Sequence, residues 1–463
     1  MIQKSGNRRL SYILFFVVMS VYIISVFSLK DRNDLIFLLM LILMVIIFFV
    51  SSSNMKLMAD RVLTFLFPIS LGITRCIWIA HPRTESMGIL QVGAGLFVSM
   101  TDIVILYFAF RGARFKPQKK NALSKTVIVF FATVIVSCTF ANEFEFSLAG
   151  ILLYLKCYVI YRWFLAYPDI KKIKKPLLHG SEIALLFQGV IATLQKIKNG
   201  PIGLQALGEA EESMRYRIVG GVIERSPAGL FEHSSRLAIF AIFAVLIILF
   251  CEVKRIKKYI LCAIGFYLLF IAAARTAIVA LIVALIYIVW KNRSRIFSKK
   301  YILYCITGFL LIIIILVYLL RNNKLDFFTS SDLLYQIGDR LTQWNLAFSY
   351  IFKRWGLIGY GINNYTSVTT EIGALSFIYL NPVHNNYILY WFELGIVGFI
   401  SYIIIFVCCF KNGRKYKHFD SISKALYIFI ICVFLYNMTG WSFATTMSIY
   451  LFWCSLGTVC REL

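Results

Sequence analysis

The chain has 463 residues, of which 60% are hydrophobic and 15% charged, and its formal net charge is +26. A soluble domain is nearer half apolar, with its apolar residues in short periodic runs. The long uncharged runs at residues 35–50 and 301–320 exclude that class. The lysines and arginines cluster between such runs, which indicates membrane topology rather than nucleic-acid binding.

The apolar runs predict an all-α, polytopic membrane protein of about fourteen (twelve to fourteen) transmembrane helices, forming a single membrane domain over residues 1–463. The first run follows a basic start like a signal peptide, but it is too long and no small-residue cleavage site follows. The predicted spans are 10–29, 35–51, 62–80, 89–110, 125–141, 146–167, 181–197, 236–251, 257–273, 276–290, 301–320, 385–410, 425–442 and 445–460.

The charge distribution predicts the orientation of these spans. With both termini in the cytoplasm, every strongly basic segment falls on one side: 111–125, 171–175, 254–258, 291–300 and 411–424. Two long segments, 198–235 and 321–384, then face outward. Loops of this length are usually functional or disordered, so any chemistry is expected at the outer face of the membrane.

The second long loop contains an amphipathic helix. Leu341, Trp344, Phe348, Ile351 and Phe352 recur at helical spacing. Such a helix either lies on the outer membrane surface or packs over the ends of the spans, and the sequence leaves both alternatives open.

His384 is the first candidate for chemistry, because it lies where the second loop enters a span. Pro382 cannot occupy a helix interior, so the helix is expected to begin near His384. A neutral imidazole there can accept a proton from a hydroxyl group. The alternative is a histidine that only caps the helix.

Arginines form the second candidate group. Arg275 lies in a turn at the outer face, where the inside-positive rule does not favour positive charge. Arg217, Arg225 and Arg340 lie in the two long loops, and Arg340 precedes Trp344 by four residues. Each alone is most often a solvated charge, but together they favour an anionic, phosphate-bearing ligand.

Charges and glycines within spans have mainly structural interpretations. Glu393 is nine residues beyond His384 and on the opposite helix face, so it is interpreted as a structural partner of another span, with Gly395 and Gly398 allowing close helix contact. Lys156 requires a partner inside the membrane, and Asp102 is the obvious candidate. A transport site is the alternative for this pair.

The sequence predicts neither a nucleotide-binding loop nor a cysteine-based disulfide or zinc site. The glycine-rich residues 356–361, which include Gly361, predict a tight turn near the active face and not a nucleotide loop, since no Lys-Ser/Thr follows. The eleven cysteines include no C-x-x-C pair, and none is placed in an outer loop, so neither a disulfide framework nor a zinc site is expected.

Four stretches resemble the O-antigen polymerase and ligase superfamily (the Wzy and WaaL type, Wzy_C-like), over roughly residues 180–410. They are residues 217–221, 273–277, 338–361 and 384–398, which include Gly338-Asp-Arg340-Leu-Thr-Gln-Trp344 and His384-Asn385-Asn386-Tyr-Ile-Leu. The last stretch is the most specific. The first 180 residues match only as generic hydrophobic spans.

The resemblance implies a metal-independent, cofactor-free membrane glycosyltransferase of the bacterial inner (plasma) membrane, facing the periplasm or cell exterior. Its partner would be a polyprenyl-pyrophosphate-linked oligosaccharide, with a chain-length regulator or flippase of the same pathway as a further candidate. His384 would be the base or acceptor-positioning group. Arg217, Arg275 and Arg340 would bind pyrophosphate, and Arg225, Asn385, Trp344 and Gly361 would line the substrate site.

Polymerase and ligase differ in the acceptor, which is another lipid-linked repeat unit or the lipid A core, respectively. Ligases of this family often have a second histidine two residues before the motif histidine, where this sequence has Pro382. The predicted number of spans also exceeds that expected of a ligase. Both points favour the polymerase, while a polysaccharide flippase and a non-catalytic membrane scaffold remain alternatives.

Overall fold

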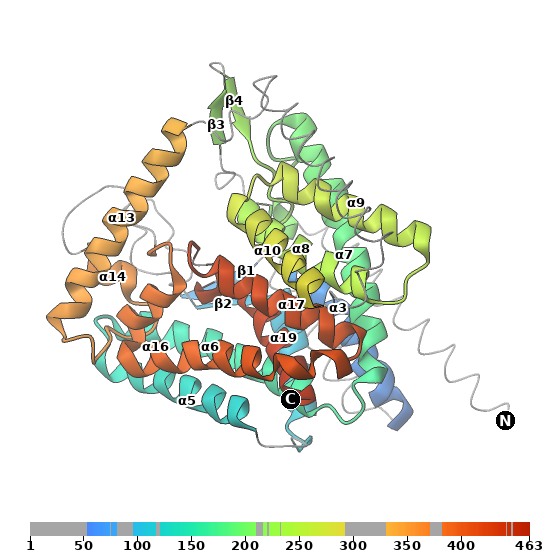
Figure 1. The fold of residues 1–463 in the computed structure, drawn as a ribbon, viewed down its shortest axis with the longest axis horizontal. Helices are drawn as coiled ribbons and strands as arrows, with labels where there is room; N and C mark the ends of the chain where they lie inside the picture. Colours follow the sequence, from blue (N-terminus) through green and yellow to red (C-terminus); the bar gives the residue numbers. More distant parts are fainter. Residues whose placement is uncertain are drawn as a thin grey trace.

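The computed structural model describes residues 53–74, 76–80, 96–116, 121–209, 216–219, 222–231, 233–291, 330–370, 382–440, 442–445 and 448–463. This part of the chain is predominantly helical, with two pairs of short antiparallel strands (Figure 1). The predicted spans at 10–29, 35–51 and 301–320 lie outside the described residues.

The helices follow the predicted apolar runs along the chain. The long ones are α3 Ser53–Leu71, α4 Met100–Gly112, α5 Ala122–Ser137, α6 Phe144–Ala166, α7 Lys171–Lys198, α8 Ser234–Phe250, α9 Arg255–Ile271, α10 Arg275–Lys291, α13 Ser330–Lys353, α16 Asn386–Asn412, α17 Ser421–Tyr436 and α19 Ser448–Glu462. The short elements are η2 Cys138–Phe140, η3 Gln205–Leu207, α14 Tyr365–Thr370, η5 Gly413–His418, α18 Ser442–Thr445, and the strands β1 Cys76–Ala80, β2 Leu96–Ser99, β3 Tyr216–Val219 and β4 Val222–Arg225.

Four of the described helical segments are long and apolar enough to cross a membrane. They are Ala122–Phe140, Phe144–Ala166, Lys171–Lys198 and Asn386–Lys411. Three more are apolar but shorter: Ser234–Phe250, Arg275–Tyr287 and Ser421–Tyr436. The total of about fourteen spans and the cytoplasmic placement of both ends stay predictions.

The predicted helices at 62–80 and 89–110 are wrong at their facing ends. Residues 76–80 and 96–99 instead form the antiparallel pair β1–β2. Helix α3 ends before Gly72, and the hydroxyl of Thr74 donates a hydrogen bond to the carbonyl of Leu230 at 2.6 Å. Hydropathy could not distinguish these strands from helix, because both strands are apolar and uncharged. Isoleucine and tryptophan, which are frequent in β1, are apolar in either structure.

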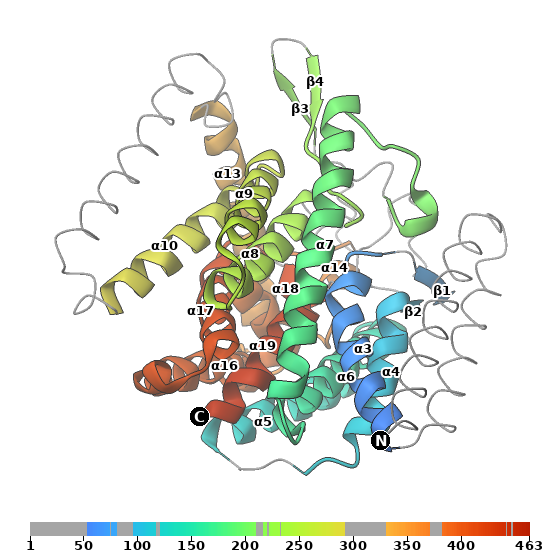
Figure 2. The ribbon, with the colours of Figure 1, turned by 90° about the vertical axis from the view of Figure 1, so that its right-hand side faces the viewer.

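Three apolar helices form the centre of the bundle. Helices α8, α17 and α19 bury nearly all of their described side chains and pack against one another (Figure 2). Around them, α3 packs on α7, α6 on α19, α5 on α16, and α10 on α17. A helix that is apolar on every face is stable either in the interior of a protein, as here, or against lipid.

A partly buried ion pair joins two of the outer helices. The predicted partnership of Lys156 and Asp102 is confirmed: the Nζ atom of Lys156 lies 2.8 Å from Oδ1 of Asp102. This pair links α6 to α4, which also pack together directly. The carboxylate of Asp102 is held further by the backbone N–H of Ser99, at 2.6 Å.

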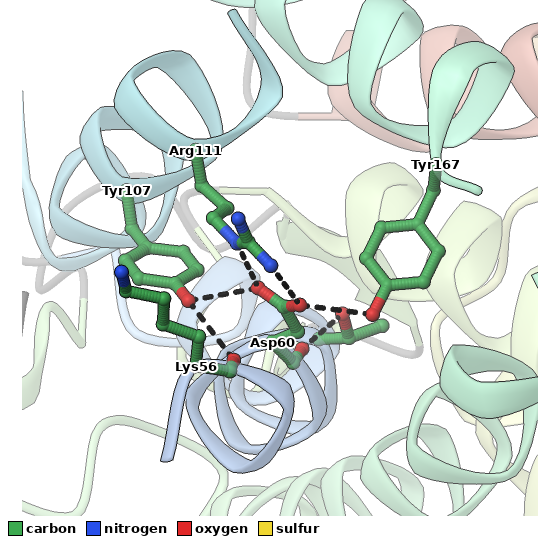
Figure 3. A network of polar contacts seen from close by, with 6 residues as sticks. Lys56, Asp60, Tyr107, Arg111 and Tyr167 are labelled. Atoms are coloured by element: carbon green, nitrogen blue, oxygen red, sulfur yellow. Dashed lines mark hydrogen bonds and ion pairs between the residues drawn. The ribbon is translucent and has the colours of Figure 1, made fainter. Parts of the chain in front are cut away.

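A second polar network centres on Asp60, a buried residue of α3 (Figure 3). Its carboxylate accepts hydrogen bonds from the hydroxyl groups of Tyr107 and Tyr167, at 2.8 and 2.9 Å. The Nε atom of Arg111 lies 3.3 Å from the same carboxylate. Because these partners come from α4 and from the end of α6, one charge fastens three helices together.

The amphipathic helix predicted in the second long loop corresponds to α13, which packs against α16. Gln343, Ala347 and Ile351 are buried on its inner face, whereas Leu341 and Phe352 are exposed. The ring of Phe348 contacts that of Trp391 of α16, with 6.2 Å between centroids. The helix therefore packs over a span, which is the second of the two alternatives that the sequence left open. It also leaves an apolar face uncovered.

Candidate functional site

The turn after α17, at residues 437–440, joins the starts of two other helices. The carbonyl of Asn437 accepts a hydrogen bond from the backbone N–H of Asn386, at 2.9 Å, and the two side-chain amides are 2.7 Å apart. The hydroxyl of Thr439 lies 3.1 Å from that of Thr276. Since Thr276 follows Arg275 and Asn386 follows His384 by two residues, this turn gathers two of the predicted site regions.

The start of α16 differs slightly from the prediction that the helix begins near His384. Asn385 is the N-cap, and its Oδ1 atom accepts hydrogen bonds from the backbone N–H groups of Tyr387 and Ile388. Its Nδ2 atom donates to the carbonyl of Met438, at 3.0 Å. Asn385 therefore supplies the cap, and the imidazole of His384 is left for other contacts.

The imidazole of His384 contacts Gln343 of α13. Oε1 of Gln343 lies 2.9 Å from Nδ1 of His384 and also accepts the backbone N–H of His384, at 3.2 Å. A backbone N–H can only donate, so the atom facing it is assigned as the amide oxygen. Nδ1 then carries the proton in the neutral ring, and Nε2 carries the lone pair.

Arg340 lies three residues before Gln343 on α13, and its charge interacts with that of Arg275, the first residue of α10. Burial lowers the pKa of Arg340 from its ordinary value, and the positive charge of Arg275 acts in the same direction. Tyr436, at the end of α17, acts in the opposite direction. Two positive charges thus interact with each other in a partly dehydrated setting, which favours binding of an anion.

Arg236 is a third cation in this region that the sequence analysis missed. It is buried, belongs to the first turn of α8 and interacts electrostatically with Tyr436, as Arg340 does. It had been counted only as the edge of the predicted span 236–251. The sequence contained the feature that could have identified Arg236. Like Arg275, it is an arginine at the outer edge of an apolar run.

The glycine-rich turn makes a close contact with α16. Gly395 has φ 72° and ψ −171°, which interrupts the helix. The backbone N–H of Gly361 donates to the carbonyl of Glu393 at 3.0 Å, and a Cβ on Gly359 would come within 2.1 Å of that oxygen. One carboxylate oxygen of Glu393 lies 3.3 Å from the N–H of Tyr365. Buried Glu393 thus fastens a loop, whereas the sequence analysis expected another span.

Three other predicted residues have structural surroundings of their own. A Cβ on Gly398 would come within 2.2 Å of Leu394 in the same helix, just beyond the break. Gly361 has φ 93°, and a Cβ there would meet Ala141 at 2.7 Å. Trp344 is half-buried and belongs to the set that packs against the core, four residues after Arg340.

Arg217 and Arg225 lie on the β3–β4 hairpin, in which Arg217 pairs with Glu224. Among the described contacts the hairpin is fastened to the end of α7: the N–H of Arg225 donates to Oδ1 of Asn199, at 2.8 Å. The ribbon shows the hairpin projecting past that end of α7 (Figure 2). The structure therefore brings the segments that carry His384 and Arg275 to the 437–440 turn, while Arg340 lies one turn before Gln343, the partner of His384. Arg217 and Arg225 lie on a separate element.

A known protein family matches the part of the chain that contains His384, Arg275 and Arg340. Residues 260–403 match the family model described as O-antigen ligase. The matched stretch contains Arg275, Arg340, Gln343 and His384, and it is consistent with the Wzy and WaaL type superfamily. No curated protein matches the chain.

The O-antigen ligase match and the apolar helices point to a membrane protein with a glycan polymerase or ligase role, of the membrane glycosyltransferase type. The match does not distinguish polymerase from ligase. Arg217, Arg225 and Arg236 lie outside the matched stretch, so their roles depend on the structure and on their chemistry. Among the described residues, no group of three His, Cys, Asp or Glu side chains could hold a metal ion.

Proposed function

We propose that the protein polymerises polyprenyl-pyrophosphate-linked oligosaccharide repeat units, of the O-antigen or capsule type. The growing glycan passes from its lipid carrier to a sugar hydroxyl of the next lipid-linked unit at the outer face of the inner membrane. The observation that carries this proposal is that the segments bearing His384 and Arg275 meet at the 437–440 turn, and that the charge of Arg340 interacts with Arg275 and Tyr436 there.

The pair of His384 and Gln343 supplies the base. With the proton fixed on Nδ1 by Gln343, Nε2 of His384 accepts the proton of the attacking hydroxyl. The hydroxyl oxygen then forms its bond to the anomeric carbon. Gln343 acts as a positioning residue, because it selects the tautomer and holds the ring without touching the reacting atoms.

The arginines stabilise the leaving group. As the bond between the anomeric carbon and the phosphate oxygen breaks, its electron pair stays on the pyrophosphate, whose negative charge increases. Arg275 and Arg340 hold fixed positive charge for it, and the lack of full hydration strengthens that attraction.

An O-antigen ligase, which transfers the glycan to the lipid A core, is the second candidate, and the description of the matching family model favours it. Pro382, in the position where ligases often have a second histidine, favours the polymerase. The same base and pyrophosphate-binding groups serve both reactions, so the acceptor decides between them.

The glycans of cells carrying wild-type protein, His384→Ala or Arg275→Ala, at matched protein levels, test the proposal. Mutants that accumulate single repeat units on the core lipid support polymerisation. Mutants that accumulate long chains on the polyprenyl carrier identify a ligase. Normal glycans in both mutants would exclude the catalytic role of this site.

A further inference from the structure

A groove lies between α7 and α9, at the end of the bundle where α9 begins. Its apolar lining comprises Leu186 of α7 and Ile256, Ile260 and Leu261 of α9. Its volume is about 530 Å³, which lies within the range of about 300–1,000 Å³ that is usual for small-molecule pockets. The groove is therefore large enough for an apolar chain.

Contacts between the two helices fix both ends of this groove. At one end Nζ of Lys257 lies 2.7 Å from the buried carboxylate of Glu182. At the other end Gly189 lets the helices approach, since a Cβ there would come within 2.9 Å of Ile264. Because an ion pair and a close glycine contact hold the helices, the groove is a lasting feature of their packing.

The positive charge at the groove lies at one end only. Lys254 and Arg255 are exposed and line it beside Lys257, at the start of α9. These residues belong to the basic segment 254–258, which the charge distribution assigns to the cytoplasmic side. Ile256 and Ile260, 76% and 54% exposed, extend the apolar surface next to them. A ligand that fits has an anionic head and an apolar tail.

We propose that the α7–α9 groove binds an anionic phospholipid of the cytoplasmic leaflet. Its phosphate contacts Lys254 and Arg255, and one acyl chain lies along Leu186, Ile260 and Leu261. Anionic lipids are concentrated in that leaflet, and basic pockets between transmembrane helices on that side are suited to their headgroups. The proposal does not depend on the glycan chemistry, because the groove and the site around the 437–440 turn share no residue.

Native mass spectrometry of the full-length protein, with phosphatidylglycerol or phosphatidylcholine of identical acyl chains, tests this proposal. Lys254→Gln combined with Arg255→Gln removes the two cations and leaves the Lys257–Glu182 pair intact. Phosphatidylglycerol binding should fall about thirty-fold, since each cation near an anionic membrane surface contributes about a factor of five. Leu186→Trp fills the apolar part and should weaken phosphatidylglycerol binding with the charges unchanged.

Lys171→Gln with Lys175→Gln is the matched control, because both lysines are exposed at the start of α7 and the charge loss is equal. Its phosphatidylglycerol binding should equal that of the wild type. Equal losses in the control and the Lys254/Arg255 variant would overturn the proposal, as would unchanged binding in the latter variant. Tighter binding of a polyprenyl phosphate than of phosphatidylglycerol at equal concentration would overturn the assigned ligand.

Discussion

The contact between Gln343 and His384 carries the most chemical information at the scale of single residues. Two donors of one residue, its backbone N–H and its ring Nδ1, meet the same amide oxygen. The sequence identified His384 from its place before a helix, but it gave no reason to select Gln343, which lies 41 positions earlier. Contacts between distant segments of this kind have no local pattern.

Gln343→Ala should lower the rate of glycan transfer by about one hundred-fold, because a correctly oriented general base contributes about 10²–10⁴. The Michaelis constant should change little, since Gln343 does not touch the substrate in this account. Steady-state kinetics of purified protein measure both parameters. An equal rise in the Michaelis constant with an unchanged turnover number would contradict a positioning role.

Gln343→Glu provides a pH readout for the same contact. A carboxylate beside the ring would stabilise the protonated imidazole and raise its pKa. The unprotonated base is then lost at a higher pH, so the acidic limb of the rate profile should move to higher pH. A profile that coincides with that of the wild type would argue against His384 as the base.

Arg236→Ala tests the cation that the sequence analysis missed. Transfer should fall by about one hundred-fold, the effect typical of losing one group that stabilises transition-state charge. Arg61→Ala, at an exposed position of α3, is the control and should retain full activity. Glycan length in cells at matched protein levels provides the measurement, and equal activity of the two variants would remove Arg236 from the site.

At the scale of elements, sequence patterns located most of the described helices but not their outer ends. Runs such as 236–251 and 257–273 correspond closely to α8 and α9, because lipid and core both require a continuous apolar surface. The run 425–442 does not correspond to one helix: α17 ends at Tyr436, and the polar turn that follows forms the centre of the proposed site. Hydropathy averages over such a turn, since Met438 and Trp441 keep the window apolar.

The break in α16 at Gly395 offers a prediction about stability. Its φ and ψ values are accessible essentially to glycine alone, and a Cβ would meet the carbonyl of Leu357 at 2.4 Å. Gly395→Ala should destabilise the protein by about 2–3 kcal/mol, because the strain of this backbone region adds to the clash. A clearly lower apparent Tm in detergent is expected.

Gly338→Ala is the control for that experiment. Gly338 belongs to α13, and a Cβ there would have nothing within 4 Å. Alanine is favoured over glycine in a helix by about 1 kcal/mol, so the apparent Tm should stay the same or rise. Equal losses in both variants would show that the break at Gly395 is not a special constraint.

The molecule as a whole is held by apolar packing at its centre and by a few charged contacts near its periphery. The central helices α8, α17 and α19 are mainly apolar, although α8 contains the buried Arg236, whereas the Asp60 network joins α3, α4 and the end of α6 (Figure 3). The sequence predicted the Lys156–Asp102 pair but not the Asp60 network, because a single acid near a predicted cytoplasmic end also fits a solvated position.

Asp60→Ala should lower the free energy of unfolding by about 3 kcal/mol, since removing one partner leaves a buried network unsatisfied. Asp169→Ala is the control, because the pair of Asp169 with Lys172 is 46% exposed on both sides and contributes at most about 1 kcal/mol. Apparent Tm values in detergent compare the two. A larger loss for Asp169→Ala would contradict the structural role given to Asp60.

The most direct test of the proposed site is glycan transfer by the purified full-length protein in lipid nanodiscs, with a polyprenyl-pyrophosphate-linked repeat unit as donor and acceptor. The account predicts chain extension by the wild type and by Arg61→Ala, and transfer at least about one hundred-fold slower in His384→Ala and Arg340→Ala. Extension at the wild-type rate in either of the last two variants would contradict a catalytic site around the 437–440 turn.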